Sequence, residues 1–355
     1  AKRQSIRLSE ILGSNTYNPL FGTTPNAWDR RRSAGGSSGG AAVALAHRLL
    51  PVADGSDFMG SLRNPAGWNH LFGLRPSQGR VPGWPKPDVW VAQLGTDGPL
   101  ARNVADLAAL LHTQSGPDPR VPLSLADEVP FAVQPAALRG LRIGWLGDLR
   151  GHLATEPGVL AVCEQALSRF SAAGAEVIPV QPLFAPEAVW EAWLVWRRAL
   201  AGASVGAVMG TPGAREKVKP EALWEYDQGR NLAFADFMAA SAVRSQFHAQ
   251  MLQHFESVDL LALPVAQVWP FDAALTWPRE VAGRAMDTYH RWMECTIYAT
   301  FAGAPALSVP AGFDATGRLP MGLQLVAAPR ADARLLAVAA AYEDLIGDLM
   351  ARRPP

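Results

Sequence analysis

Cysteine is scarce in this sequence, with only Cys163 and Cys295 among 355 residues. Two cysteines far apart in apolar, helix-like surroundings are too few for a disulfide framework or a cysteine-based metal site. We expect both to be buried, unreactive thiols of a protein in a reducing compartment. The seven histidines show no metal-ligand spacing, so we expect neither a metal nor a cofactor.

Long apolar runs are also missing. No run reaches the roughly 18 residues that a membrane-spanning helix needs, and no apolar stretch follows the basic residues at the start, as a secretory signal would require. Acidic and basic residues number 32 each, so no net charge draws the chain toward nucleic acid or anionic lipid. We therefore expect a soluble, cytoplasmic protein that acts on a small molecule.

Helical and strand-like patterns alternate along the chain. Apolar runs predict strands, and helical spacing of apolar residues predicts helices between them. The unit at 141–180 reads as strand, helix and strand, which favours a parallel or mixed sheet. The expected strands are 51–53, 141–146, 175–180, 260–264, 306–310 and 322–326; the expected helices are 41–50, 100–111, 157–173, several within 182–255, and 331–344. No linker interrupts this order, so we expect one α/β domain over 1–355, with a mixed sheet covered by helices on both faces.

A glycine- and serine-rich cluster occupies residues 34–40 and runs into strong helix formers. It is too short and too close to a helix to make a good flexible linker. It matches the Gly-x-Ser-x-Gly nucleophile elbow around Ser37 or Ser38, but the charged residues before it cannot form the buried strand that an elbow needs. A phosphate-binding loop would require a lysine followed by Ser or Thr, which is missing. The remaining interpretation is a turn that presents two hydroxyl groups near a helix N-terminus.

A second cluster, residues 57–66, combines a glycine and a serine after an expected strand. Gly60 carries no side chain beside Ser61, so successive backbone N–H groups from Phe58 onward could point at one spot. Backbone N–H groups arranged in this way form the oxyanion hole that acyl transfer needs. An ordinary strand-to-helix turn, with Arg63 and Pro65 setting its exit, is an equally open interpretation from these residues alone.

The two clusters together resemble the core signature of the amidase-signature family of serine hydrolases. Ser37 and Ser61 are separated by a helix and a strand at the spacing that this family shows. The resemblance covers nearly the whole chain and is weakest in the helical region 182–255. It is carried by residues 35–42, 57–66, 73–82, 98–106, 302–310 and 319–326.

The resemblance implies a mixed-sheet α/β fold and a triad of two serines and a lysine. Ser61 would attack the amide carbonyl and form an acyl-enzyme, and Ser37, after a cis peptide bond from Gly36, would pass the proton. A neutral lysine with a lowered pKa would be the general base. The family's backbone oxyanion hole maps onto Phe58, Met59 and Gly60, with Ser61 beside them. Supporting positions are Gly36, Ser38, Asp57 and Arg63.

Two features depart from the family pattern. The family usually has glycine where this chain has Met59, and a side chain there narrows the turn or redirects it toward the acyl pocket. The chain has only four lysines, at positions 2, 86, 217 and 219. The family's lysine lies further upstream of the first serine than this sequence reaches. We expect the domain at 1–355 to lack the N-terminal part that carries the catalytic lysine, which a longer parent or a second chain would supply; a homodimer is another possibility.

These residues predict an amidase that releases an amine or ammonia from a small carboxylic amide, with no nucleic-acid or membrane partner. Two other functions stay open: the A subunit of a glutamine-dependent tRNA amidotransferase, and a non-catalytic relative that keeps the fold. Trp190, Trp193 and Trp196 recur at helical spacing. Core packing explains such a stripe more often than a ligand pocket does.

Overall fold

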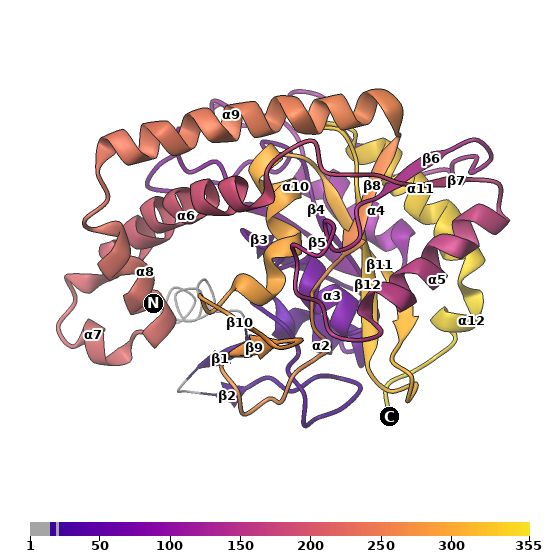
Figure 1. The fold of residues 1–355 in the computed structure, drawn as a ribbon, viewed down its shortest axis with the longest axis horizontal. Coiled ribbons are helices and arrows are strands. Elements are labelled where there is room, and N and C mark those ends of the chain that lie inside the picture. The colour runs from indigo at the N-terminus through magenta and orange to yellow at the C-terminus, as the bar shows by residue number, and fades with distance from the viewer. Residues whose placement is uncertain (1–14, 19–20) are drawn as a thin grey trace.

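The computed structural model describes residues 15–18 and 21–355, and its centre is an eight-stranded mixed sheet (Figure 1). The strand order is β3-β5-β4-β11-β12-β8-β6-β7. Neighbouring strands from β3 to β8 are antiparallel, whereas β6 is parallel to both β8 and β7. The bounds are β3 (Val52–Asp57), β4 (Phe72–Arg75), β5 (Thr96–Ala101), β6 (Arg142–Trp145), β7 (Glu176–Pro179), β8 (Leu260–Pro264), β11 (Ala306–Phe313) and β12 (Pro320–Val326).

Helices cover both faces of this sheet, as predicted. Helices α4 (Val104–Gln114) and α5 (Val159–Ala172) lie against the sheet and both contact α11 (Asp332–Leu345), which is followed by the short α12 (Gly347–Met350). Helix α3 (Arg63–Trp68) contacts β4, β11 and β12, and it also contacts α2 (Gly39–Ala46). The mixed α/β architecture follows from the alternating strand and helix patterns of the sequence.

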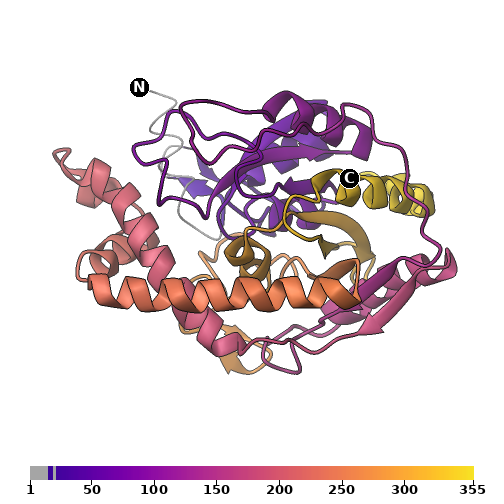
Figure 2. The same cartoon turned by 90° about the horizontal axis from the view of Figure 1, so that it is seen from above.

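The region 182–255 is helical, as expected, and it projects to one side of the sheet (Figures 1 and 2). Its two long helices contact each other, and the second of them also contacts α10. The bounds are α6 (Pro186–Met209), α7 (Ala214–Lys217), α8 (Pro220–Gly229), α9 (Phe234–Ser257), the 3-10 helix η1 (Arg291–Thr296) and α10 (Ile297–Ala302); two small hairpins comprise β1 (Tyr17–Asn18) with β2 (Gly22–Thr23) and β9 (Glu280–Val281) with β10 (Arg284–Ala285).

The first part of the expected helix 100–111 is wrong. Leu100 lies in β5, because this strand pairs with β3 and β4 as far as Ala101. The helix starts only at Val104, after Asn103, whose side chain accepts a hydrogen bond of 2.7 Å from the Asp106 N–H. An asparagine that caps the first turn in this way satisfies a backbone donor that the helix leaves unpaired.

The long strand β3 and the helices beside it position both serine clusters. β3 extends to Asp57, beyond the three residues predicted, because β5 pairs with it along its whole length. The glycine- and serine-rich residues before Gly39 lead directly into α2, and Ser61 lies in the turn between β3 and α3. The two clusters therefore meet at the β3 edge of the sheet.

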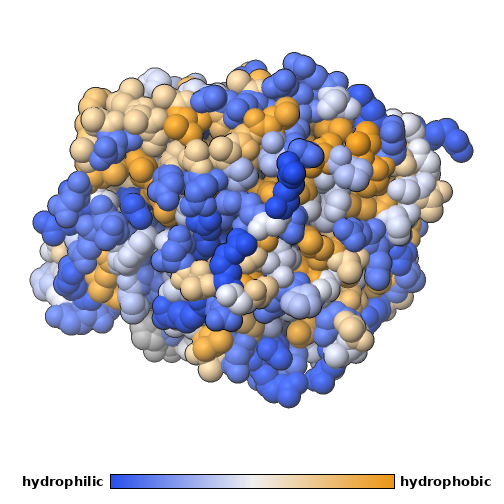
Figure 3. Space-filling view, in the orientation of Figure 1, coloured by the Kyte–Doolittle hydropathy of each residue, from blue (hydrophilic) through white to orange (hydrophobic). Residues whose placement is uncertain are grey.

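Apolar and polar side chains are mixed on the face shown in Figure 3, and apolar residues gather over α9. Phe234 and Met238, near the start of that helix, are among its exposed apolar residues. Among the described helices, none is both long enough and apolar enough to cross a membrane.

Candidate active site

The two serine clusters are in direct contact. The Ser38 N–H donates a hydrogen bond of 3.2 Å to the backbone oxygen of Ser61. The Ser38 hydroxyl occupies the space that a side chain on Gly55 would fill, so the first cluster lies directly against β3. The peptide bond between Gly36 and Ser37 is cis, as the family resemblance implies. The structure thus brings Ser37, Ser38 and Ser61 to one place.

The first cluster is held by a threonine before it and an asparagine after it. The Thr16 hydroxyl donates to Gly35 O over 2.8 Å and accepts from the Gly39 N–H over 3.2 Å. Asn64 Oδ1 accepts from the Gly36 N–H over 3.3 Å, which ties the cluster to helix α3. Gly35 has a φ of +79°, and a side chain on it would collide with Asn64. The turn therefore needs glycine at this position.

Asp57 organises the second cluster. Its carboxylate accepts the Gly60 N–H at 2.8 Å and the Leu62 N–H at 3.2 Å, and it pairs with the Arg63 guanidinium at 2.9 and 2.8 Å. Both charged side chains are fully buried. Burial acts to raise the pKa of Asp57, yet the adjacent Arg63 cation and these hydrogen bonds lower it to about 2. Asp57 is therefore ionised, and its charge is compensated inside the protein.

Arg63 joins this turn to distant parts of the chain. Its guanidinium donates to Thr296 O over 2.9 Å and to the Thr300 hydroxyl over 3.1 Å, and it also bonds to Gln324 on β12. Gly60, at a φ of +80°, lies against the Thr296 side chain so closely that a Cβ atom would overlap it. The turn around Ser61 is thus fixed from η1, α10 and β12 as well as from β3.

The structure changes one part of the predicted oxyanion hole. The Gly60 N–H donates to the Asp57 carboxylate, so it is already engaged and is not available to an oxyanion. In the part of the chain that the structure describes, the N–H groups of Phe58, Met59 and Ser61 have no hydrogen-bond acceptor. The Met59 side chain is buried in the main core.

The helical region contributes residues that the sequence pattern did not reveal. The Phe58 ring contacts the Trp193 ring at 5.6 Å between centroids and lies 5.4 Å from the Arg197 guanidinium. Arg197 pairs with buried Glu225 at 2.5 Å, and the Tyr289 hydroxyl donates to the same carboxylate at 2.7 Å. Helical spacing had singled out Trp193, but Arg197 lies on α6, Glu225 on α8 and Tyr289 in the segment before η1, so no spacing in the sequence could have identified these three as neighbours.

The three tryptophans at helical spacing on α6 belong to the hydrophobic core. Trp190, Trp193 and Trp196 are all buried, and Trp193 and Trp196 both contact the Phe301 ring. Trp193 also reaches the turn through Phe58. The three tryptophans therefore pack α6 onto α10, and Trp193 also packs against the turn at Phe58.

The described lysines are not partners of the two serines. Lys2 lies outside the described residues. Within residues 15–18 and 21–355, Ser37 and Ser61 make no hydrogen bond to a lysine. Lys217 lies on α7, and Lys219 lies 4.0 Å from the Tyr17 ring. The same described part of the chain contains no group of His, Cys, Asp and Glu residues that could hold a metal ion.

Comparison with known proteins agrees with this geometry. The family model Amidase matches residues 9–336. The A subunit of glutamyl-tRNA(Gln) amidotransferase from Synechococcus sp. (strain RCC307) is 35% identical over 366 residues, covering 97% of this chain and 73% of the relative. A bacterial aryl acylamidase of the amidase-signature enzymes superposes with a TM-score of 0.87 at 28% identity, over 97% of this chain and 73% of the other. A 6-aminohexanoate cyclic dimer hydrolase gives a TM-score of 0.80 at 28% identity, over 96% and 74%.

The chain belongs to the amidase family, the amidase-signature enzymes. It is an amidohydrolase that acts on linear carbon–nitrogen bonds, in a family in which catalysis relies on serine. The resemblance of the two serine clusters to this family and the predicted mixed α/β fold are confirmed.

Proposed function

We propose that Ser61 is the nucleophile of an amidase and that Ser37 passes its proton. The observation that carries this proposal is the contact between the two serine clusters at the edge of β3, where the Ser38 N–H meets Ser61 O. A second support is the free N–H groups of Phe58 and Met59 beside the nucleophile, among the described residues. A nucleophile, a hydroxyl that relays the proton and preorganised donors are the parts that acyl transfer needs.

In the proposed reaction Ser61 Oγ attacks the amide carbonyl carbon while its proton passes to Ser37 Oγ, and the hydroxyl proton of Ser37 moves on to the leaving nitrogen. The carbonyl oxygen gains negative charge, which the N–H groups of Phe58, Met59 and Ser61 stabilise. The carbon–nitrogen bond then breaks, and the nitrogen, which now carries the proton relayed by Ser37, departs as an amine or ammonia. Water attacks the acyl-enzyme in the same manner and releases the acid. The buried Asp57–Arg63 pair takes no part in bond making; it fixes the turn that carries the donors.

Labelling with a serine-directed fluorophosphonate tests this proposal. Wild-type protein should become labelled at Ser61, and Ser61→Ala should abolish the label. A matched control is Ser168→Ala on α5, whose hydroxyl bonds only to its own helix, and which should label like wild type. Label that persists in Ser61→Ala, or that maps to another serine, contradicts the assignment. A folded wild type that never labels would favour a non-catalytic relative.

A second candidate is the A subunit of a glutamine-dependent amidotransferase, because the Synechococcus relative carries that name at 35% identity. This function requires partner subunits and glutamine as the ammonia source. Comparing hydrolysis of an aryl amide, acetamide and glutamine separates the candidates: preference for the aryl amide or acetamide supports the amidase, and preference for glutamine supports the amidotransferase subunit.

We also propose a small-molecule amide as the partner and a cytoplasmic location. The second proposal rests on the two free cysteines, which are both buried and form no disulfide. Fractionation of cells that express the protein tests it, and recovery in a secreted or periplasmic fraction would contradict it.

A further inference from the structure

Arg75, the last residue of β4, is fully buried at the start of the turn that carries Ser61, and the proposed reaction does not use it. Its guanidinium donates to the backbone oxygen of Asp57 and, over 2.8 Å, to the backbone oxygen of Leu94. It lies 3.8 Å from the Asp57 carboxylate, which already pairs with Arg63 at 2.8 and 2.9 Å. Arg63 supplies the charge that Asp57 needs, so the bonds of Arg75 to the backbone need another explanation.

The Asp57 oxygen that Arg75 binds belongs to the same peptide group as the Phe58 N–H. This peptide bond is trans, because the cis bonds of the described residues are those before Ser37 and Pro85. In a planar trans peptide the C=O and the N–H point in opposite directions. Arg75 therefore directs the Phe58 N–H away from itself, to a side where this N–H has no acceptor among the described residues.

The other contacts of this turn hold side chains rather than the peptide group. Arg63 binds the Asp57 carboxylate, and Trp193 contacts the Phe58 ring. A rotation of the peptide group could leave both contacts in place and still reverse its C=O and N–H. The carbonyl oxygen would then take the place of the N–H and repel a forming oxyanion. Arg75 opposes this rotation, because a fully buried guanidinium would lose one of its acceptors.

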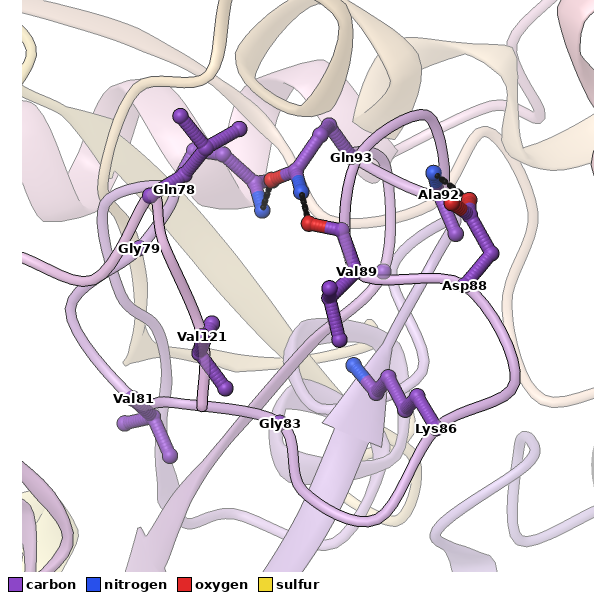
Figure 4. A pocket seen from close by; sticks show the side chains of 12 residues that line it. Gln78, Gly79, Val81, Gly83, Lys86, Asp88, Val89, Ala92, Gln93 and Val121 are labelled. Carbon is purple, nitrogen blue, oxygen red and sulfur yellow. Dashed lines mark hydrogen bonds between the residues drawn. The ribbon is translucent and has the colours of Figure 1, made fainter. Parts of the chain in front are cut away.

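The second acceptor of Arg75, the Leu94 oxygen, is held by the loop before it (Figure 4). Gln93 Nε2 donates to Val89 O over 3.0 Å, and Gln93 Oε1 accepts from Gln78 Nε2 over 2.8 Å. The two glutamines line the small pocket drawn in Figure 4. Arg75 is thus anchored to a fixed backbone at one end and holds the peptide group at the other.

Arg75 also gives this region an excess of positive charge. Arg63, Arg75 and Asp57 are all fully buried, and two cations against one anion leave one net positive charge. Burial lowers the pKa of Arg75 to about 9, so its guanidinium stays protonated near neutral pH. A buried positive charge beside the turn favours the negative charge that develops on the carbonyl oxygen during acyl transfer.

We propose that Arg75 is a positioning residue for the reaction, which orients the Asp57–Phe58 peptide group so that the Phe58 N–H faces the oxyanion. Arg75 does not touch the substrate and acts through the backbone. This inference rests on the proposed function, because the oxyanion forms only when Ser61 attacks an amide. Without the guanidinium the N–H turns away, so the transition state loses a donor while binding of the substrate in its ground state is unchanged.

The test is the rate at which a fluorophosphonate labels Ser61 in wild type, Arg75→Met and Arg80→Met, at a temperature where thermal melts show all three folded. Ser61 Oγ gives up its proton and displaces fluoride from phosphorus, and the phosphonyl oxygen takes the place of the oxyanion. Arg75→Met should lower the limiting rate at saturating reagent at least about tenfold, toward the roughly hundredfold effect of losing one oxyanion donor. The reagent concentration that gives half this rate should stay the same.

Arg80→Met is the matched control. It removes another buried arginine, one that binds the Asp332 carboxylate and the Asp127 backbone oxygen away from the turn, and it should label at the wild-type rate. An equal loss of rate in Arg80→Met overturns the inference, because the loss then reflects general destabilisation. An unchanged rate in Arg75→Met overturns it as well, and the proposed function stands as long as Ser61→Ala is not labelled.

A crystal structure of the phosphonylated wild type decides the inference if Arg75→Met does not fold. The phosphonyl oxygen should lie within about 3 Å of the Phe58 nitrogen, with the Asp57 oxygen still bound to Arg75. A phosphonyl oxygen bound elsewhere, or a reversed peptide group, overturns the inference. Wild type that is never labelled at Ser61 contradicts the proposed function and the inference with it.

Discussion

Replacing Arg63 by methionine tests whether the buried ion pair holds the turn around Ser61. Arg63 and Asp57 are both fully buried, and the guanidinium makes two hydrogen bonds of 2.8–2.9 Å to that carboxylate. Methionine fills a similar volume but leaves a buried negative charge with two backbone N–H groups and the more distant Arg75 guanidinium, at 3.8 Å. Removing one partner of a buried pair costs about 3–5 kcal/mol in the free energy of unfolding. Natural proteins are stable by about 5–15 kcal/mol, so Arg63→Met takes a large share of the total.

The assay is urea unfolding at low temperature, followed by tryptophan fluorescence, for a matched set of variants. Arg169→Met is the control, because Arg169 pairs with an exposed Asp348 at the surface and such pairs contribute at most about 1 kcal/mol. Adding Asp57→Asn to Arg63→Met removes both charges, so the double variant should lose less than the sum of the two single losses. A loss in Arg63→Met no greater than that of the control, or strict additivity, would refute the reasoning.

The pH dependence of stability tests the Asp57–Arg63 ion pair in a second way. The pKa of Asp57 is lowered in the folded protein to about 2, so this group stabilises the fold above its unfolded pKa of about 3.9 and the contribution is lost as pH falls toward 2. In Arg63→Met the carboxyl loses its nearest cation, and burial then raises its pKa. Protonation relieves the buried charge, so the deficit of Arg63→Met should shrink as pH is lowered. A deficit that stays constant between pH 7 and 4 contradicts this explanation.

Three further outcomes follow from the structure. Gly60→Ala places a Cβ atom at a positive φ and against the Thr296 side chain, so the free energy of unfolding should fall by about 2–4 kcal/mol. The control Gly347→Ala has open space around it and should change stability little. Burial lowers the pKa of His70 to about 4, so as pH falls the unfolded chain binds a proton before the folded protein does. The melting temperature should therefore fall between pH 6.5 and 4. His70→Gln should make this pH dependence weaker, and an unchanged dependence in the variant contradicts the assignment to His70. Burial raises the pKa of Cys163 and Cys295, so a thiol reagent should label neither until the protein is unfolded, and rapid native labelling would be inconsistent with the fold.

Much of the fold could be predicted because its signals are local. The apolar run at 260–264 and the strand, helix and strand at 141–180 appear where expected, and β6 and β7 are parallel. The serine clusters were recognisable because glycine and serine are concentrated in two short segments. The prediction for 100–111 failed at its start because apolar spacing does not distinguish the end of β5 from the first turn of α4.

The remaining parts of the site depend on contacts between distant segments. The hydrogen bond from the Gly60 N–H to Asp57 depends on the orientation of the Asp57 carboxylate, which Arg63 fixes. A side-chain orientation of this kind cannot be predicted from the sequence. The pairing of Arg197 with Glu225 joins two helices, and nothing in either helix marks its partner. The pocket lined by Gln78, Lys86 and Gln93 likewise depends on how a loop folds back beside Gly95.

The long-range bonds of Arg63 have a consequence for the order in which the protein acquires its site during synthesis. The sequence separation is 233 residues to Thr296 and 261 residues to Gln324, and β4 pairs with β11 across a comparable distance. Contacts this distant form late, because the chain must first close a long loop. Until the segments that contain Thr296 and Gln324 have emerged from the ribosome, Arg63 lacks these hydrogen-bond partners and the turn around Ser61 is not held in place. A nascent chain should therefore carry an unformed, protease-sensitive serine loop until most of the polypeptide has emerged.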